Sequence, residues 1–276
     1  MSCCPPGSIG PAPLAIKERK GKMIALTPKE DSKRKDLPTY IVGQEEAPSS
    51  IVVVLTDVYG IDSGNQKAFC DALSERLDSS LVIMPDLFRG RPIMGSWGLP
   101  HGVTMSLAIP SIVWCSKTRL TDTAIEIDLL EVVLPYLNKF ETAKISIVGL
   151  CYGAWVMGRA LALEQLSHLK CGVGIHPTWK IEQIHGKTEA ALAAAVKDKA
   201  ILFLAANNDD LKVGTPIIQQ LSKQRGNIDE NLISIEFPDM VHGFVARGDA
   251  NDPKIAEQQE KVLSLTVDFI KAEEAK

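Results

Sequence analysis

Long apolar runs are missing from this sequence. Hydrophobic residues make up 45% of its 276 positions, yet no stretch approaches the ~18–20 consecutive apolar residues that a membrane span needs. The first residues, MSCCPPGSIGPAP, also lack the apolar region of a secretory signal peptide. We therefore expect a cytoplasmic protein without a membrane span.

A strong positive charge is missing as well. The chain has 30 lysines and arginines against 34 aspartates and glutamates, a formal net charge of −4. It contains no basic run long enough to bind nucleic acid. We interpret the charged run KEDSKRK at 29–35 as a solvated loop. The sequence thus predicts no nucleic-acid partner, and it indicates no particular oligomeric state.

Cysteines at metal-binding spacing are absent too. There is no CxxC pair and no His/Cys cluster at zinc spacing, so the cysteines do not indicate a zinc site. A long chain with a large core and no signal peptide favours reduced thiols. The six cysteines are Cys3, Cys4, Cys70, Cys115, Cys151 and Cys171. The first two lie in a proline-rich start, residues 1–15, which we interpret as a flexible tail.

What the sequence does contain is an alternation of strand-like and helix-like segments. Continuously apolar runs occur at 51–56, 80–84, 144–149, 171–175, 200–205 and 231–237. Helical patterns occur at about 65–78, 121–139, 152–167, 188–198, 215–225 and 254–273. Apolar strands of this kind are typical of a parallel sheet covered on both faces. We predict one α/β domain over residues 1–276, mostly parallel and doubly wound, with ligand chemistry at the carboxyl ends of the strands.

Residues 89–118 break this alternation. They contain proline, glycine and two tryptophans with weak periodicity. Long irregular segments in compact domains often cover a site, and others are packed insertions. Both interpretations stay open for this segment.

The stretch Gly149-Leu150-Cys151-Tyr152-Gly153 joins a predicted strand to a predicted helix. It has the form of a nucleophile elbow with cysteine in place of serine, where glycines permit a very tight turn. The helix N-terminus stabilises a thiolate at this corner, and the Tyr152 N–H is placed to hold an oxyanion. The alternative is that Cys151 is a small buried hydrophobic residue at a helix start.

A nucleophile of this fold is followed in the chain by an acid and then a histidine. His242, just past the run at 231–237, fits this order best. The other histidines are His101, His168, His176 and His185, of which His176 ends a strand and is a candidate for lining the pocket. Asp209 and Asp210 follow the run at 200–205, and spacing does not separate them. Asp209 is our first choice for the acid, with turn formation as the alternative role for both.

Five stretches give the chain a wider resemblance: LTDVYG, MPDLFRG, GLCYGA, ANNDD and VHGF, in this order from residue 38 to the C-terminus. They resemble the dienelactone hydrolase family of α/β-hydrolases. The resemblance implies that Cys151 is the nucleophile, His242 the base and Asp209 the acid. It also implies that the Val58 N–H is the second oxyanion donor.

The resemblance implies further roles around this centre. Asp57 stands where the bacterial enzymes carry a glutamate that gates the nucleophile, and the alternative is that Asp57 caps a turn. Arg89 and Arg247 lie near the positions of two arginines that bind a substrate carboxylate, each displaced by one residue. Tyr59 and His176 are expected to line the same substrate pocket.

The resemblance thus implies a small-molecule substrate, a lactone or ester, that is hydrolysed through a thioester on the cysteine. This reaction requires neither a metal nor an organic cofactor, so we expect none. Two other functions remain open at this point. One is a general cysteine esterase or thioesterase, and the other is a non-catalytic member of the fold that binds or assembles with a partner.

Overall fold

The computed structural model describes residues 5, 7–10, 19–93 and 121–276. Our predictions for Cys3, Cys4, His101, Cys115 and most of the segment 89–118 therefore fall outside the described residues. In the described part of the chain, no helix combines the length and the apolarity that crossing a membrane requires.

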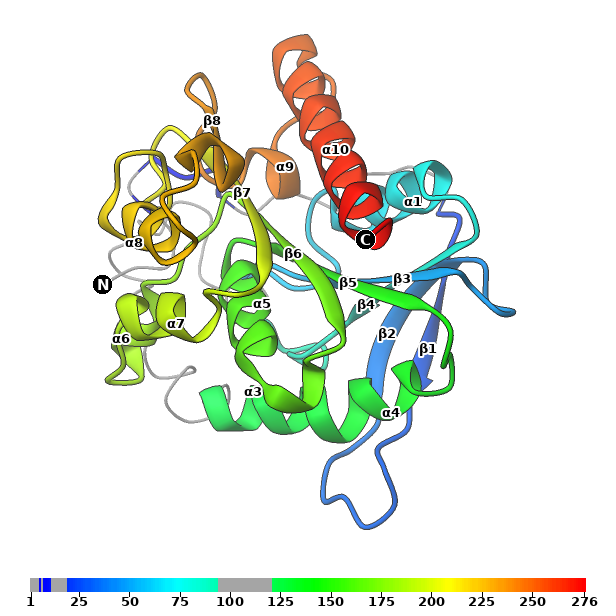
Figure 1. The fold of residues 1–276 in the computed structure, drawn as a ribbon. Helices are drawn as coiled ribbons and strands as arrows, with labels where there is room; N and C mark the ends of the chain where they lie inside the picture. Colours follow the sequence, from blue (N-terminus) through cyan, green and yellow to red (C-terminus); the bar gives the residue numbers. More distant parts are fainter. Residues whose placement is uncertain (1–4, 6, 11–18, 94–120) are drawn as a thin grey trace.

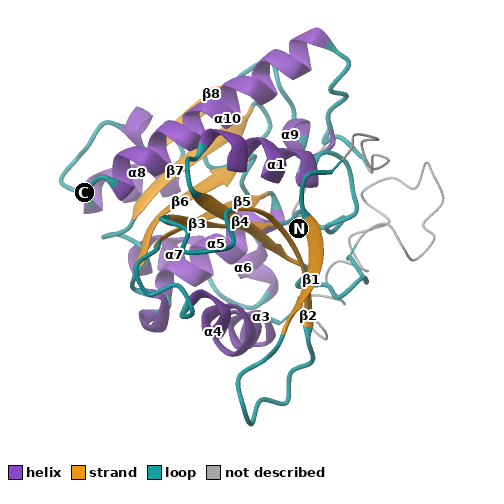
Figure 2. Cartoon of the chain, turned by 90° about the vertical axis from the view of Figure 1, so that its right-hand side faces the viewer, coloured by secondary structure: helices purple, strands orange, loops and turns teal. Residues whose placement is uncertain are grey.

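An eight-stranded sheet forms the centre of the protein, in the order β1-β2-β4-β3-β5-β6-β7-β8 (Figures 1 and 2). The strands are β1 Lys22–Leu26, β2 Leu37–Gly43, β3 Ser50–Leu55, β4 Ser80–Pro85, β5 Lys144–Leu150, β6 Leu169–Ile175, β7 Ala200–Ala206 and β8 Ser234–Phe237. Neighbouring strands from β4 to β8 are parallel, whereas β1 and β2 join the edge in antiparallel pairing. The predicted, mostly parallel sheet is confirmed.

Helices cover both faces of this sheet, as predicted. They are α1 Gln66–Arg76, α3 Asp122–Asp128, α4 Leu134–Leu137, α5 Tyr152–Ala162, α6 Ile181–Ile184, α7 Glu189–Ala195, α8 Pro216–Gln224, α9 Phe244–Arg247 and α10 Pro253–Glu274. Helices α1, α9 and α10 pack on one face, and α3, α4, α5 and α7 lie on the opposite side of the sheet (Figure 2).

The side chains of β3 show why the run at 51–56 is apolar throughout. Ile51, Val53 and Leu55 belong to the core cluster under α5, and Val52 and Val54 belong to the cluster under α1 and α10. Successive residues of a strand point to opposite faces. A strand with helices on both sides therefore needs apolar residues at every position.

Four elements differ from the sequence-based prediction. Strands β1 and β2 were not predicted, because β1 is a short edge strand with three exposed positions and β2 contains a proline. Strand β8 begins at Ser234 and not at 231, since Asp229 accepts a hydrogen bond from the Asn231 N–H (2.9 Å) and starts a short 3-10 turn there. The predicted helix at 121–139 is helical but contains a π-helical turn, Leu129–Val133.

Candidate active site

The parallel strands bring several predicted site residues to one edge of the sheet. Cys151 follows β5 directly, and His176 follows β6 directly. Asp209 and His242 lie in the loops after β7 and β8, and Asp57 lies just after β3. The carboxyl ends of parallel strands point the same way, so all five residues belong to the edge where such folds place their ligand sites.

Cys151 occupies a strained corner between β5 and α5. Its backbone has φ 54° and ψ −110°, outside the regions that residues with a side chain prefer. The Cys151 N–H donates to the Ile175 carbonyl (3.0 Å), which continues the pairing of β5 with β6 past the end of the strand. The Cys151 side chain is buried, and it adjoins the N-terminal end of α5.

Glycines on both sides of Cys151 make the corner possible. A Cβ on Gly149 would lie 2.2 Å from the Gly153 carbonyl oxygen, and a Cβ on Gly153 would lie 2.2 Å from the Leu55 carbonyl oxygen. Both distances are far below van der Waals contact, so only glycine fits. The first turn of α5, with Tyr152 at its start, therefore packs against the end of β3, just before Val58.

The Nδ1 atom of His242 lies 2.6 Å from Oδ1 of Asp209, and both side chains are fully buried. Asp209 also accepts the Ala206 N–H through Oδ2 (2.6 Å), which fixes the carboxylate on its loop. Burial raises the pKa of Asp209, and the proximity of His242 opposes this rise. Asp210 instead contacts Lys180, with 2.7 Å between Oδ1 and Nζ. The structure thus brings Asp209, and not Asp210, to the imidazole.

His176 is a buried neighbour of His242. The two ring centroids are 5.1 Å apart in an edge-to-face arrangement, and the His176 ring also contacts Phe244 at 6.1 Å. The backbone of His176 has φ 36°, while its N–H donates to the Leu204 carbonyl (2.8 Å). A left-handed conformation in a residue other than glycine is costly, and such strain clusters at functional sites.

Asp57 and Arg247 form a buried ion pair across the site. Oδ2 of Asp57 accepts from the Arg247 guanidinium, and both side chains are fully buried. Oδ1 of Asp57 accepts from the Tyr59 N–H (2.9 Å), which is the turn-capping contact that the sequence offered as an alternative role. The Arg247 guanidinium also lies over the Tyr59 ring, 4.5 Å from its centroid. The ion pair itself was not predicted.

Arg89 lies in a different ion-pair group. Its guanidinium makes two contacts with Asp128 of α3 (2.7 and 2.8 Å) and donates to the Lys35 carbonyl (3.2 Å). Arg34, from the loop at 29–35, binds the same carboxylate. The two predicted carboxylate-binding arginines are therefore paired with separate aspartates, and their role in substrate binding stays a prediction.

Residues that the sequence analysis missed support this edge. The buried side chain of Gln66 accepts the Asp57 N–H (3.0 Å) and donates to Asp57 Oδ1 (3.1 Å) and the Gly60 carbonyl (2.8 Å). Asn208 accepts the His242 N–H through its side chain (2.7 Å). Polar side chains at a helix start or in a loop give no local signal of such contacts, although Asn208 lies within the recognised stretch ANNDD.

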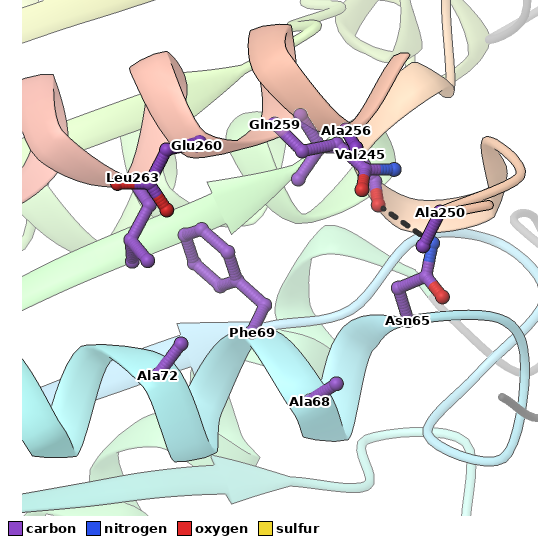
Figure 3. Close-up of a pocket in the computed structure, with 10 residues that line it drawn as sticks. All are labelled: Asn65, Ala68, Phe69, Ala72, Val245, Ala250, Ala256, Gln259, Glu260 and Leu263. Atoms are coloured by element: carbon purple, nitrogen blue, oxygen red, sulfur yellow. Dashed lines mark hydrogen bonds between the residues drawn. The ribbon is translucent and has the colours of Figure 1, made fainter. Parts of the chain in front are cut away.

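A separate cavity of about 260 Å³ lies between α1 and α10 (Figure 3). In Figure 3, Phe69 points from α1 across this cavity toward α10. No predicted site residue lines it. Across the described residues, no group of three or more histidine, cysteine, aspartate or glutamate side chains is arranged to hold a metal ion.

The groups at the carboxyl edge are those that acyl-transfer chemistry uses. A thiol lies at a helix N-terminus, and an imidazole is held by a buried carboxylate. A thiolate there is stabilised by the helix end, and an imidazole oriented in this way accepts and returns protons.

Comparison with known proteins gives this arrangement a family context. The sequence profile of the dienelactone hydrolase family matches residues 37–274. The hydrolase pyvD of Aspergillus violaceofuscus (strain CBS 115571) is 26% identical over 222 residues, covering 78% of this chain and 78% of the relative.

Solved structures share the fold at low sequence identity. A dienelactone hydrolase-like promiscuous phosphotriesterase from metagenomic libraries has a TM-score of 0.60 and 12% identity, covering 92% of this chain and 99% of its own. A putative dienelactone hydrolase from Klebsiella pneumoniae subsp. pneumoniae MGH 78578 has a TM-score of 0.56 and 13% identity, covering 90% and 99%. Likeness at this identity concerns the fold, which is that of the α/β-hydrolases. Because the family profile spans most of the chain, this protein belongs to the dienelactone hydrolase family and is a hydrolase.

Proposed function

We propose that this protein hydrolyses small lactones or esters with Cys151 as nucleophile, His242 as general base and Asp209 as the acid that orients it. One observation carries the proposal: the buried 2.6 Å contact between His242 and Asp209, at the sheet edge where Cys151 occupies its strained corner. A histidine held by a buried carboxylate keeps one tautomer and orientation, as an acyl-transfer base requires.

In the proposed first half-reaction, the Cys151 sulfur attacks the substrate carbonyl carbon and the carbonyl π electrons move to oxygen. His242 accepts the thiol proton. The tetrahedral intermediate then collapses and breaks the ester or ring C–O bond. The leaving alkoxide takes the proton from His242 and departs as an alcohol, leaving a thioester on Cys151.

The second half-reaction uses the same groups in reverse. His242 takes a proton from a water molecule, whose oxygen attacks the thioester carbonyl. The new tetrahedral intermediate expels the Cys151 sulfur, which recovers its proton from His242, and a carboxylic acid is released. We assign the oxyanion of both intermediates to the N–H groups of Tyr152 and Val58, because the first belongs to the start of α5 and the second follows β3.

Charged groups near this centre shape the proposed substrate range. Asp57 gates the nucleophile in this proposal by disfavouring a nearby thiolate, and its pairing with Arg247 weakens that effect. Arg247 is paired with Asp57 and Arg89 with Asp128. To bind a substrate carboxylate, either guanidinium has to contact the substrate and its aspartate together or release the aspartate. Tyr59 and His176 complete the proposed pocket wall.

The test compares lactones, p-nitrophenyl esters and acyl thioesters, each in neutral and anionic form, with the full chain and with Cys151→Ala. We expect turnover of a lactone or ester by the full chain, loss of turnover in Cys151→Ala, and an acyl group on the Cys151 peptide in quenched reactions analysed by mass spectrometry. Turnover that survives in Cys151→Ala would overturn the nucleophile assignment. A clear preference for thioesters would favour the thioesterase alternative, and no turnover of any substrate would favour a non-catalytic member.

A further inference from the structure

The N-terminal segment, residues 7–10, lies against the loop that carries His242. The Ile9 N–H donates to the His242 carbonyl (2.9 Å), and the Ile9 carbonyl accepts from Nε of Arg247 (2.9 Å). Both backbone groups of one residue are therefore bound to the two ends of the segment 242–247. These contacts join parts of the chain that are more than two hundred positions apart.

The first of these hydrogen bonds acts beside a flexible position in the backbone. Gly243, next to His242, has φ 93° and belongs to no regular element before α9 begins at Phe244. Glycine is the residue with the most backbone freedom, so an external hydrogen bond to the His242 carbonyl limits how this loop moves.

The second hydrogen bond acts on a buried charge. Arg247 is 3% exposed, and a buried guanidinium needs acceptors for its N–H groups. Asp57 supplies one acceptor and the Ile9 carbonyl supplies another. Asp57 in turn accepts a hydrogen bond from the Tyr59 N–H (2.9 Å). Contacts therefore run from Ile9 through Arg247 to the loop that contains Val58.

Further contacts show that this segment is docked on the fold. The Ile9 side chain packs against the core cluster that contains Phe244 and Val245 of α9. Ser8 makes a local turn, with its N–H (3.2 Å) and hydroxyl (2.5 Å) donating to the Pro5 carbonyl. The described part of the predicted tail at 1–15 thus lies on the active-site loops.

We propose that Ile9 is a positioning residue of this active site. Its N–H fixes the backbone of the general base, and its carbonyl fixes the arginine that holds Asp57. This inference rests on the proposed function, because it gives Ile9 a part in setting the geometry of the His242 and Asp57 loops. Both backbone groups of Ile9 are bound to His242 and Arg247, so in this proposal Ile9 acts through these two residues.

The first experiment compares the full chain with a variant that lacks residues 1–9. Phenylglyoxal labelling of Arg247, mapped by mass spectrometry, measures whether the guanidinium has become accessible to solvent. We expect labelling to become at least tenfold faster and kcat to fall by roughly 10- to 100-fold, the effect of about one or two lost hydrogen bonds to charged or catalytic groups. A synthetic peptide of residues 2–12 should slow the labelling again and restore part of kcat.

The second experiment isolates the single hydrogen bond to His242. Ile9→Pro removes the N–H, whereas its matched control Ile9→Ala keeps both backbone groups and shortens only the side chain. We expect Ile9→Pro to lower kcat by a larger factor than it changes KM, and to shift the pH profile of kcat. Ile9→Ala should have kcat, KM and a pH profile close to those of the full chain. Equal behaviour of the two variants would overturn the positioning role, as would unchanged Arg247 labelling in the truncated chain.

The two proposals fail in different ways. If the full chain hydrolyses none of the substrates, the proposed function is wrong, and the positioning role is then measured by the pH dependence of Cys151 alkylation. A shift of that profile in Ile9→Pro but not in Ile9→Ala supports the positioning of the His242 loop. Superimposable profiles overturn it.

Discussion

His242 and Asp209 are in direct contact, with 2.6 Å between Nδ1 and Oδ1, whereas the neighbouring Asp210 is turned toward Lys180. Asp209→Asn should therefore lower kcat by about 10⁴-fold, because an amide holds the imidazole in the wrong tautomer. Asp210→Asn is the matched control, and we expect it to change kcat by less than about twofold, since its surface ion pair contributes little. Similar losses of kcat in both variants would show that the acid that orients His242 does not lie in this loop.

Cys151→Ala should abolish hydrolysis while the protein stays folded. The substitution removes only the sulfur atom from a buried corner, so we expect little change in the thermal unfolding midpoint. Cys70→Ala, on the buried face of α1, is the control and should keep full activity. An inactive Cys70→Ala with unchanged folding would point to a different nucleophile.

The cysteines should react with iodoacetamide in a fixed order. Burial raises the pKa of Cys171 to about 12, and burial likewise raises the pKa of Cys70. Only thiolates react at a useful rate, so between pH 7 and pH 9 both side chains stay protonated and unreactive. Cys151, at the start of α5, should be labelled first among these three.

Peptide mapping after short labelling gives the measurement, and labelling of the unfolded chain gives the control in which all six cysteines react. Cys171 labelled ahead of Cys151 at pH 7 would count against an activated thiol at the corner.

The Asp57–Arg247 pair should be important for stability as well as for the site. Arg247→Met leaves a buried carboxylate without its cation, which we expect to lower the free energy of unfolding by about 3–5 kcal/mol. The double variant Asp57→Asn/Arg247→Met should regain part of that loss, a coupling that a double-mutant cycle in urea would measure. Lys22→Met, which breaks the exposed pair with Glu45, is the control and should cost less than about 1 kcal/mol. Additive effects of the two core substitutions would show that the pair is not coupled.

Gly153→Ala should damage both the fold and the reaction. An added Cβ would lie 2.2 Å from the Leu55 carbonyl oxygen, so the start of α5 has to move away from the end of β3. We expect a lower unfolding midpoint and a kcat loss of roughly 10²- to 10³-fold, the effect of misplacing one oxyanion donor. Gly10→Ala, whose Cβ would meet nothing within 4 Å, is the control substitution. Full activity in Gly153→Ala would show that the start of α5 does not supply an oxyanion donor.

Features that depend on neighbouring residues were predictable from the sequence. The corner at Cys151 is one, because the two glycines and the change from strand to helix all lie within the stretch 149–153. The buried central strands are another, since their apolar runs are continuous. Edge strand β1 was missed because a short, partly exposed strand carries a weak pattern, and β2 was missed because it contains a proline.

Features that join distant parts of the chain were not predictable in the same way. Asp209 and Asp210 are equivalent in spacing, and only the path of the loop after β7 decides which one meets His242. The pairing of Asp57 with Arg247 and the contact of Ile9 with both ends of segment 242–247 depend on how loops meet over the edge of the sheet. No local pattern of residues encodes such a meeting.

The left-handed backbone at Cys151 restricts which residues evolution or an engineer can place there. Its φ of 54° is a conformation that β-branched residues adopt only as rare outliers. Threonine is therefore excluded as a nucleophile at this position, although its hydroxyl group would be suitable. Serine has the same branching as cysteine at Cβ, so exchange between a thiol and a primary hydroxyl changes the reactive atom without rebuilding the turn.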